Sequence, residues 1–264
     1  MDVRNRVALI TGASMGIGAA TARALAEAGC RVALVARSTD ALTVLAEEIR
    51  AQGGQALPLP GDVADRLTAE AAVGQTLQVF GRLDILLNNA AVGLHRSPLG
   101  AAWADVERLM AVNLYGPLAF MRAAVPPMRE VGGGLIVNVS SIVGRRAVPR
   151  IGVYCASKAA LERLSDSLRL ELAPDNIRVV TLYPGVTDTG FNRHTLDVGV
   201  GLRPGRMRGA SPERVARAVL RVIRREPRDA YASIFDRAFV TFSTLLPGVA
   251  DVILRRYFAS RGQH

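Results

Sequence analysis

The chain has 264 residues, of which 50% are hydrophobic and 21% are charged, and its formal net charge is +10. This composition is typical of a globular protein with a substantial core and excludes a long disordered chain. A run of about 18 apolar residues, which a membrane-spanning helix needs, does not occur. The few residues before the first apolar run are too short for a signal peptide, so we expect a cytoplasmic protein.

Apolar runs alternate along the chain with segments of helical periodicity. The predicted strands cover residues 7–10, 31–36, 56–59, 83–87, 135–139 and 178–182, with a short strand near Tyr231. The predicted helices cover residues 19–28, 40–51, 65–80, 103–130, 153–173 and 212–225. This alternation predicts a single α/β domain over residues 1–264, built on a doubly wound parallel sheet with helices on both faces. Ligands bind such sheets at the carboxyl ends of the strands.

A glycine-rich turn, TGASMGIG at residues 11–18, joins the first predicted strand to the first helix. Glycines there let the backbone approach a pyrophosphate, and the helix that follows presents free N–H groups to the anion. Three glycines between a strand and a helix also occur for packing alone. If the turn holds a dinucleotide, we expect contacts from Gly12, Ser14, Met15, Gly16, Ile17 and Gly18.

The end of the second strand indicates which dinucleotide is preferred. Proteins that prefer NAD usually place an acidic residue here to bind the ribose hydroxyls, but this chain has Ala36 followed by Arg37. An arginine suits the additional phosphate of NADP(H), so the pattern favours NADP(H) over NAD(H). The alternative is that Arg37 merely reflects a chain with 32 arginines and one lysine.

That single lysine, Lys158, lies four residues after Tyr154, so the two side chains share one face of the predicted helix. The pKa of a free tyrosine is about 10, and a nearby ammonium lowers that pKa towards neutrality. The pair therefore suits general acid–base catalysis on an alcohol or carbonyl. Taken alone, the pattern also fits a surface pair. The strand at 135–139 is followed by Ser140 and Ser141. Their hydroxyls could hydrogen-bond the carbonyl oxygen of a substrate, but serines at strand ends also serve as turn and cap residues.

These motifs together resemble the short-chain dehydrogenase/reductase family over about residues 4–190. The glycine-rich turn, the NNAA segment at 88–91, Asn113, a strand-end serine and the Tyr154/Lys158 pair occur in the family's order. In this family the catalytic serine precedes the tyrosine by 13 positions, which selects Ser141. The resemblance implies a Rossmann-like fold and an enzyme that often assembles as a homodimer or homotetramer.

The resemblance also implies residue roles. Tyr154 would be the acid/base, Lys158 would lower its pKa and hold the nicotinamide ribose, Ser141 would orient the reacting oxygen, and Asn113 would hold a water linked to Lys158. The remaining implied cofactor contacts are Asp62, Val63, Asn89, Ala90, Pro184, Gly185, Thr187 and Thr189. The chain departs from the family at Ala91, where glycine is usual, and at Met15, where many NADP-using relatives carry a basic residue.

The C-terminal quarter carries most of the positive charge. Residues 193–264 contain 14 arginines against 6 acidic residues, a net charge of +8. Residues 190–210, rich in glycine and arginine, are expected to form a substrate flap. Residues 235–264 form a basic, apolar extension, interrupted at Pro247-Gly248, for which three alternatives remain open: a packed helix pair, a dimer interface, or a helix on a membrane surface.

We therefore expect an oxidoreductase that transfers a hydride between NADP(H) and the alcohol or carbonyl group of a small, apolar molecule. The alternative is a non-catalytic dinucleotide-binding scaffold that contacts a membrane or protein through its basic C-terminus. We expect no nucleic-acid partner, because no recognition motif accompanies the charge. Cys30 and Cys155 form no metal pattern or disulfide framework, so we expect no metal site.

Overall fold

The computed structural model describes residues 1–191, 195–197 and 209–259. Parallel strands in this part of the chain form one seven-stranded sheet in the order β3-β2-β1-β4-β5-β6-β7. The strands are β1 (Val7–Thr11), β2 (Arg31–Ala36), β3 (Ala56–Pro60), β4 (Ile85–Asn88), β5 (Gly134–Val139), β6 (Ile177–Tyr183) and β7 (Asp229–Tyr231).

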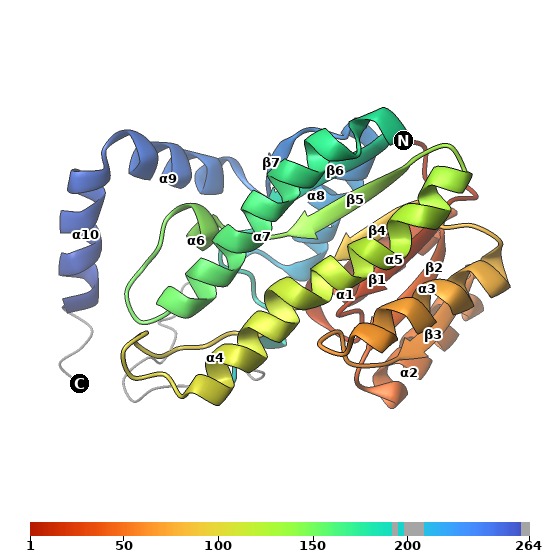
Figure 1. The fold of residues 1–264 in the computed structure, drawn as a ribbon, viewed down its shortest axis with the longest axis horizontal. Helices are drawn as coiled ribbons and strands as arrows, with labels where there is room; N and C mark the ends of the chain where they lie inside the picture. The colour runs from red at the N-terminus through yellow and green to blue at the C-terminus, as the bar shows by residue number, and fades with distance from the viewer. Residues whose placement is uncertain (192–194, 198–208, 260–264) are drawn as a thin grey trace.

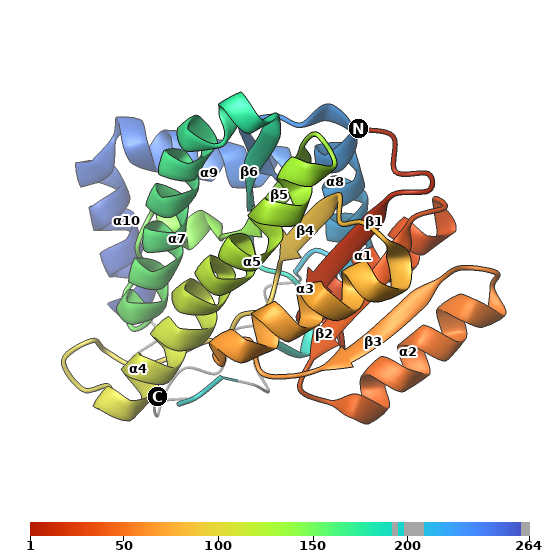
Figure 2. The ribbon, with the colours of Figure 1, turned by 45° about the vertical axis from the view of Figure 1, so that its right-hand side comes forward.

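Helices cover both faces of the sheet, as Figures 1 and 2 show. One face carries α1 (Gly16–Glu27), α2 (Thr39–Ala51) and α8 (Pro212–Arg225). The other carries α3 (Arg66–Phe80), α5 (Gly116–Glu130) and α7 (Gly152–Glu171). This arrangement confirms the predicted doubly wound, Rossmann-like parallel sheet.

The apolar strands supply the core on both sides of the sheet. Along β1, Ala8 and Ile10 pack into the cluster beneath α1, α2 and α8, whereas Val7 and Leu9 pack into the cluster beneath α3, α5 and α7. Successive strand side chains point to opposite faces, so a strand covered on both sides must be apolar throughout. The two buried layers fix the strands rigidly and thereby fix the positions of their carboxyl ends.

The strand order reverses between β1 and β4, which lie side by side at the centre of the sheet. After β3 the chain continues through α3, and the next strand, β4, pairs with β1 on the side away from β2. At the carboxyl ends of β1 and β4 the loops that follow the strands therefore run in opposite directions, and a crevice opens between them. The glycine-rich turn follows β1 and the NNAA segment follows β4, so both motifs meet at this crevice.

Two local features differ from the sequence prediction. The single helix predicted at 103–130 consists of α4 (Trp103–Met110), a π-helical turn (Ala111–Tyr115) and α5. A short helix, α6 (Ile142–Arg145), follows β5 and was not predicted. The Ser141 hydroxyl caps α6 by accepting a hydrogen bond from the Val143 N–H at 3.4 Å. Four residues show no hydrophobic periodicity, which is why the pattern did not reveal this helix.

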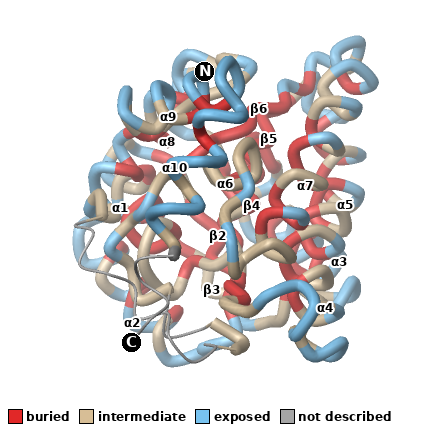
Figure 3. Tube along the Cα trace, turned by 90° about the vertical axis from the view of Figure 1, so that its left-hand side faces the viewer, coloured by how far each residue is buried: buried red, intermediate tan, exposed pale blue. Residues whose placement is uncertain are grey.

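The C-terminal extension forms two helices, α9 (Ile234–Leu245) and α10 (Pro247–Ala259), which lie at one end of the molecule in Figure 1. They meet at a bend of 115°. Buried positions gather along the strands in Figure 3, whereas α9 and α10 are mainly exposed or half-buried. The flap predicted at 190–210 lies largely outside the described residues. Of its described part, Leu196 donates to the Gly93 carbonyl at 3.0 Å.

Candidate active site

The glycine-rich turn closely approaches the end of β4. Gly12 has a φ of +66°, and a Cβ added there would lie 2.8 Å from the Ala90 Cα. A Cβ on Gly18 would lie 2.2 Å from the Gly12 carbonyl oxygen. Only glycine fits these positions, which leaves an open cradle at the start of α1. Met15 caps α1 without a side-chain hydrogen bond, so N–H groups of the first turn remain available to an anion.

A pocket opens at the crevice between β1 and β4 and collects most of the predicted site residues. Of the predicted cofactor contacts, Gly18 alone is not among the residues that line the pocket. Gly18 lies behind the turn, where a side chain would collide with the Gly12 carbonyl oxygen. Ser141, Tyr154 and Lys158 line the same pocket. The other predicted residues on its wall are Gly12, Ser14, Met15, Gly16, Ile17, Arg37, Asp62, Val63, Asn89, Ala90, Pro184, Gly185, Thr187 and Thr189.

One end of the pocket is polar and carries two arginines, Arg37 and Arg108, beside Asp62. Burial acts to raise the pKa of Asp62, but hydrogen bonds from the Ala64 N–H and from Arg108, with which it forms an ion pair, outweigh it and lower the pKa below its usual range. Asp62 is therefore ionised and held in place. Sequence reasoning missed Arg108, because it lies on α4, 46 residues from Asp62 along the chain, and only tertiary packing brings the two together.

Asn89 has a structural role in addition to its place on the pocket wall. Its side-chain amide donates to the carbonyls of Thr11 at 3.0 Å and Gly12 at 3.2 Å. The Thr11 hydroxyl accepts from the backbone N–H groups of Asn89 and Ala90. These bonds tie the end of β4 to the glycine-rich turn, so Asn89 shapes the cradle. Thr11 belongs to the motif, but no role was predicted for it.

The other end of the pocket holds the predicted acid–base group. The Lys158 ammonium is buried, donates to the Val139 carbonyl at 2.9 Å and lies 5.9 Å from the centre of the Tyr154 ring. The Ser141 hydroxyl is 3.4 Å from the Pro184 carbonyl oxygen. The neighbouring Ser140 hydroxyl is buried and donates to the Lys158 carbonyl at 3.2 Å. Ser140 is thus committed to the scaffold, while Ser141 stands closer to Tyr154.

The expected lowering of the Tyr154 pKa by Lys158 is not found in the protein alone. Burial raises the pKa of Tyr154 above its ordinary value, and a hydrogen bond with Ser141 opposes this only in part. Burial also lowers the pKa of Lys158 to about 8. The low-dielectric site disfavours both charged forms, and the ammonium is directed towards the Val139 carbonyl. Tyr154 is therefore protonated at neutral pH and ready to donate.

Asn113 is fully buried in the π-helical turn and is not among the residues lining the pocket. Its side chain accepts from the Val92 N–H at 2.9 Å and donates to the Val92 carbonyl and the Ser157 hydroxyl. These contacts hold the segment after β4 against α7, the helix that carries Tyr154 and Lys158. The water link to Lys158 that the resemblance implies stays a prediction.

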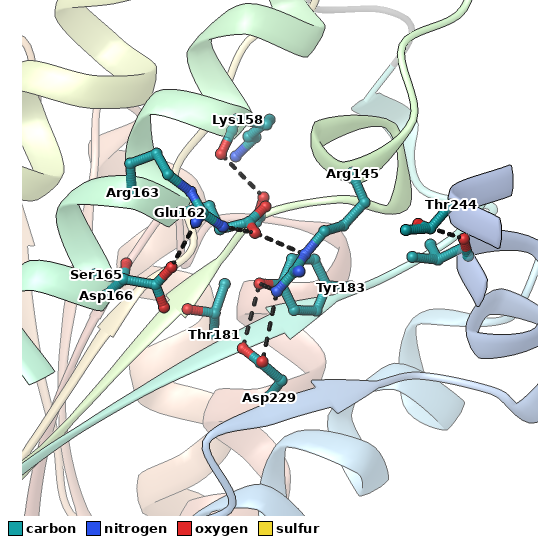
Figure 4. Close-up of polar contacts among 12 residues, drawn as sticks. Arg145, Lys158, Glu162, Arg163, Ser165, Asp166, Thr181, Tyr183, Asp229 and Thr244 are labelled. Atoms are coloured by element: carbon teal, nitrogen blue, oxygen red, sulfur yellow. Dashed lines mark hydrogen bonds and ion pairs between the residues drawn. The ribbon is translucent and has the colours of Figure 1, made fainter. Parts of the chain in front are cut away.

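A polar network behind α7 was not predicted from the sequence. Arg145, at the end of α6, forms an ion pair with the buried Glu162 at 2.6 Å and another with Asp229 at 3.4 Å. Its guanidinium lies over the Tyr183 ring, 4.7 Å from the centre, and donates to the Tyr183 hydroxyl at 2.6 Å. Figure 4 shows how these side chains join α6, α7, β6 and β7. Arg145 thereby ties α6, which begins next to Ser141, to the helix of Lys158.

The wall near Tyr154 is mainly apolar. The Tyr154 and Phe191 rings lie 5.9 Å apart between centres. Around them the pocket is lined by Val92, Ile142, Val143 and Ile151. A small group of polar atoms set in an apolar wall orients a ligand without requiring that the ligand be polar elsewhere.

The fold and this pocket define a class of protein, the dinucleotide-binding oxidoreductases. Comparison with known proteins gives the family. A family model described as short chain dehydrogenase matches residues 6–197, and the chain belongs to this family. It is 36% identical over 266 residues, 96% of this chain and 83% of the relative, to the "Dehydrogenase/reductase SDR family protein 7-like" of Anopheles gambiae.

Solved structures agree with this assignment. A metagenomic short-chain oxidoreductase in complex with NADP superposes with a TM-score of 0.71 at 34% identity, covering 84% of this chain and 91% of the other. The 3-ketoacyl-(acyl-carrier-protein) reductase of Brucella melitensis, complexed with NADH, gives 0.77 at 29% identity, covering 87% and 96%. A nicotinamide dinucleotide is therefore this chain's cofactor, and the comparisons leave open which form it prefers.

Proposed function

We propose that this NAD(P)-dependent dehydrogenase/reductase uses NADP(H) and acts on the alcohol or carbonyl group of an apolar small molecule, with Tyr154 as the acid/base. The observation that carries the proposal is the single pocket that holds Ser141, Tyr154 and Lys158 in an apolar wall at one end and Arg37 at the other. The scaffold alternative gains no support, because Ser141, Tyr154 and Lys158 are all present and line the pocket.

The residues divide the work along the pocket. The glycine-rich turn and the first turn of α1 would hold the pyrophosphate, and Arg37 would bind the phosphate specific to NADP(H). When bound, the cofactor supplies or accepts the hydride. Ser141 orients the substrate oxygen by a hydrogen bond, and the protonated Tyr154 donates its phenolic proton to that oxygen as a carbonyl is reduced. In the protein alone the Lys158 ammonium is directed to the Val139 carbonyl; with cofactor and substrate bound, its positive charge would favour the phenolate left behind.

Replacing Tyr154 by Phe tests the reaction. The variant removes the hydroxyl and keeps the ring, so we expect NADPH binding to persist while turnover of a panel of apolar ketones falls by roughly 100-fold or more. Fluorescence titration and NADPH oxidation measure the two quantities. Full turnover by Tyr154→Phe would overturn the assignment of Tyr154, and loss of NADPH binding would show that the residue acts mainly in binding.

Assembly and location stay predictions. We propose a homodimer or homotetramer on the family resemblance alone, which light scattering of the purified chain tests. We propose a cytoplasmic location, which fractionation of the source cells tests.

A further inference from the structure

The outer side of α9 carries an apolar stripe. Phe235 is 78% exposed and Leu245 is 73% exposed, although both have large apolar side chains. A helix advances by about 100° per residue, which places both on one side of α9. Val240 and Ser243, on the opposite side, are buried against the body of the protein. The stripe comprises Ile234, Phe235, Phe242, Leu245 and Leu246.

The next helix, α10, repeats the arrangement. Val249, Val252 and Ile253 are exposed on one side, and Ala250 is buried. Arg256 lies on the same side as the exposed apolar residues, and Arg255 lies next to it; both are exposed. Arginine places its apolar stem along such a surface and its charged head at the boundary with water. We call the exposed apolar residues of α9 and α10, together with these two arginines, the outer face.

The shape of the pair suits a surface. No single helix in the described part of the chain has the length and hydropathy to cross a membrane. Taken together, α9 and α10 meet these criteria, but the bend of 115° separates them into two shorter helices. Large apolar side chains scattered singly over a protein need no partner, whereas several of them gathered on two successive helices mark an interaction site.

The two helices that carry the outer face lie beside the pocket. Asp236 of α9 lies so close to Gly185, a pocket residue, that an added Cβ on that glycine would be 2.1 Å from the Asp236 carboxylate. Arg146, which follows α6, forms an ion pair with Asp251 of α10. The two helices are therefore fixed beside the wall that contains Ser141. A ligand that partitions into a layer covering these helices is concentrated near the pocket.

We propose that the outer face binds an anionic lipid surface. The apolar residues alone would equally suit a second copy of the chain. The charge decides between them: the outer face carries the exposed Arg255 and Arg256 and no acidic residue, and Asp251 of α10 is already paired with Arg146, so a symmetric contact between two copies would bury arginines with no carboxylate of the face to pair them. Anionic headgroups instead attract exposed arginines such as Arg255 and Arg256 while the apolar side chains enter the acyl boundary.

Vesicle flotation of the full chain tests the proposal. We expect binding to phosphatidylcholine vesicles that contain phosphatidylglycerol and much weaker binding to phosphatidylcholine alone. The double variant Phe235→Ser/Leu245→Ser should lose binding to both. Removing Arg255 or Arg256 by substitution with Gln should weaken binding to the anionic vesicles about fivefold each. Leu67→Ser is the matched control: Leu67 is 68% exposed on α3, outside the outer face, and its loss should change nothing.

Two results would overturn the proposal. One is a wild-type chain that does not bind vesicles but forms a concentration-dependent dimer, seen by light scattering, which Phe235→Ser/Leu245→Ser abolishes. A second copy of the chain would then cover the outer face. The other is absence of vesicle binding by the wild type, whatever its oligomeric state. NADPH titration of each variant checks that the fold and the cofactor site are intact. A variant that binds NADPH but not vesicles has lost lipid binding alone, so a failure of the lipid proposal is distinguishable from a failure of the proposed reaction.

Discussion

Tyr154 and Lys158 show how a buried site sets the protonation of its own residues. Burial raises the pKa of the phenol and lowers that of the ammonium, so each is pushed towards its neutral form. The sequence correctly placed the two side chains on one face of a helix. It did not reveal that the ammonium would be directed to the Val139 carbonyl, because that contact joins the helix to a strand end 19 residues away.

The lowered Lys158 pKa has a measurable consequence for stability. Between about 8 and the ordinary 10.5, the unfolded chain binds more protons at this residue than the folded chain does. Its contribution to the free energy of unfolding therefore rises with pH across this window. We expect the stability of the wild type, measured relative to Lys158→Met without cofactor, to increase from pH 8 to pH 10 in thermal unfolding.

The comparison with Lys158→Met cancels the titration of groups common to both proteins, such as Cys155, whose pKa is raised by burial. A stability difference that stays flat, or falls, over this range would contradict a buried Lys158 with a lowered pKa.

Among the elements, α6 links Ser141 to the rest of the sheet. It is only four residues long, yet Ser141 caps its start and Arg145 ends it in a network with Glu162, Tyr183 and Asp229. So short a helix has little stability of its own, and tertiary contacts must hold it. The position of Ser141 in the pocket therefore depends on the buried ion pair between Arg145 and Glu162.

Arg145→Met tests this dependence. Removing the arginine leaves the buried Glu162 carboxylate with a poorer partner, which should cost on the order of 3 kcal/mol in the free energy of unfolding. A displaced Ser141 should lower kcat by roughly ten- to a hundredfold with little change in NADPH affinity. Chemical denaturation and steady-state kinetics measure these effects.

Arg163→Met is the control for Arg145→Met, because Arg163 pairs with the same carboxylate from a side chain that is 66% exposed. An exposed partner contributes about 1 kcal/mol or less, and kcat should hardly change. Equal effects of the two substitutions on kcat would show that Arg145 does not position Ser141.

The sequence predicted most elements because strand and helix periods differ so clearly here. Continuous apolar runs marked the six longer strands, and the predicted ends of β2 coincide with those observed. The π-helical turn at Asn113 and the short helix α6 were missed. Both are held by side-chain contacts from distant segments, Val92 and Ser157 in one case and Glu162 in the other. Local patterns carry no signal for such contacts.

For the whole molecule, the strand order determines where the chemistry lies. The glycine-rich turn, the acid–base group and Arg37 come from distant parts of the chain, and the parallel sheet brings them to one edge. The glycine-rich turn and Arg37 were predicted from the residues themselves, and the family resemblance implied most of the other residues that meet there. They did not reveal the ion pair between Arg108 and Asp62 beside Arg37, because that pair depends on the packing of α4.

The central claim is that this pocket binds NADP(H) for hydride transfer. The most direct measurement is a fluorescence titration of the purified chain with NADPH and with NADH, repeated with Arg37→Ala. We predict that NADPH binds more tightly, and that Arg37→Ala weakens NADPH binding at least about tenfold while NADH binding is nearly unchanged. Tighter binding of NADH would contradict the preference assigned to Arg37, and binding of neither would contradict the account as a whole.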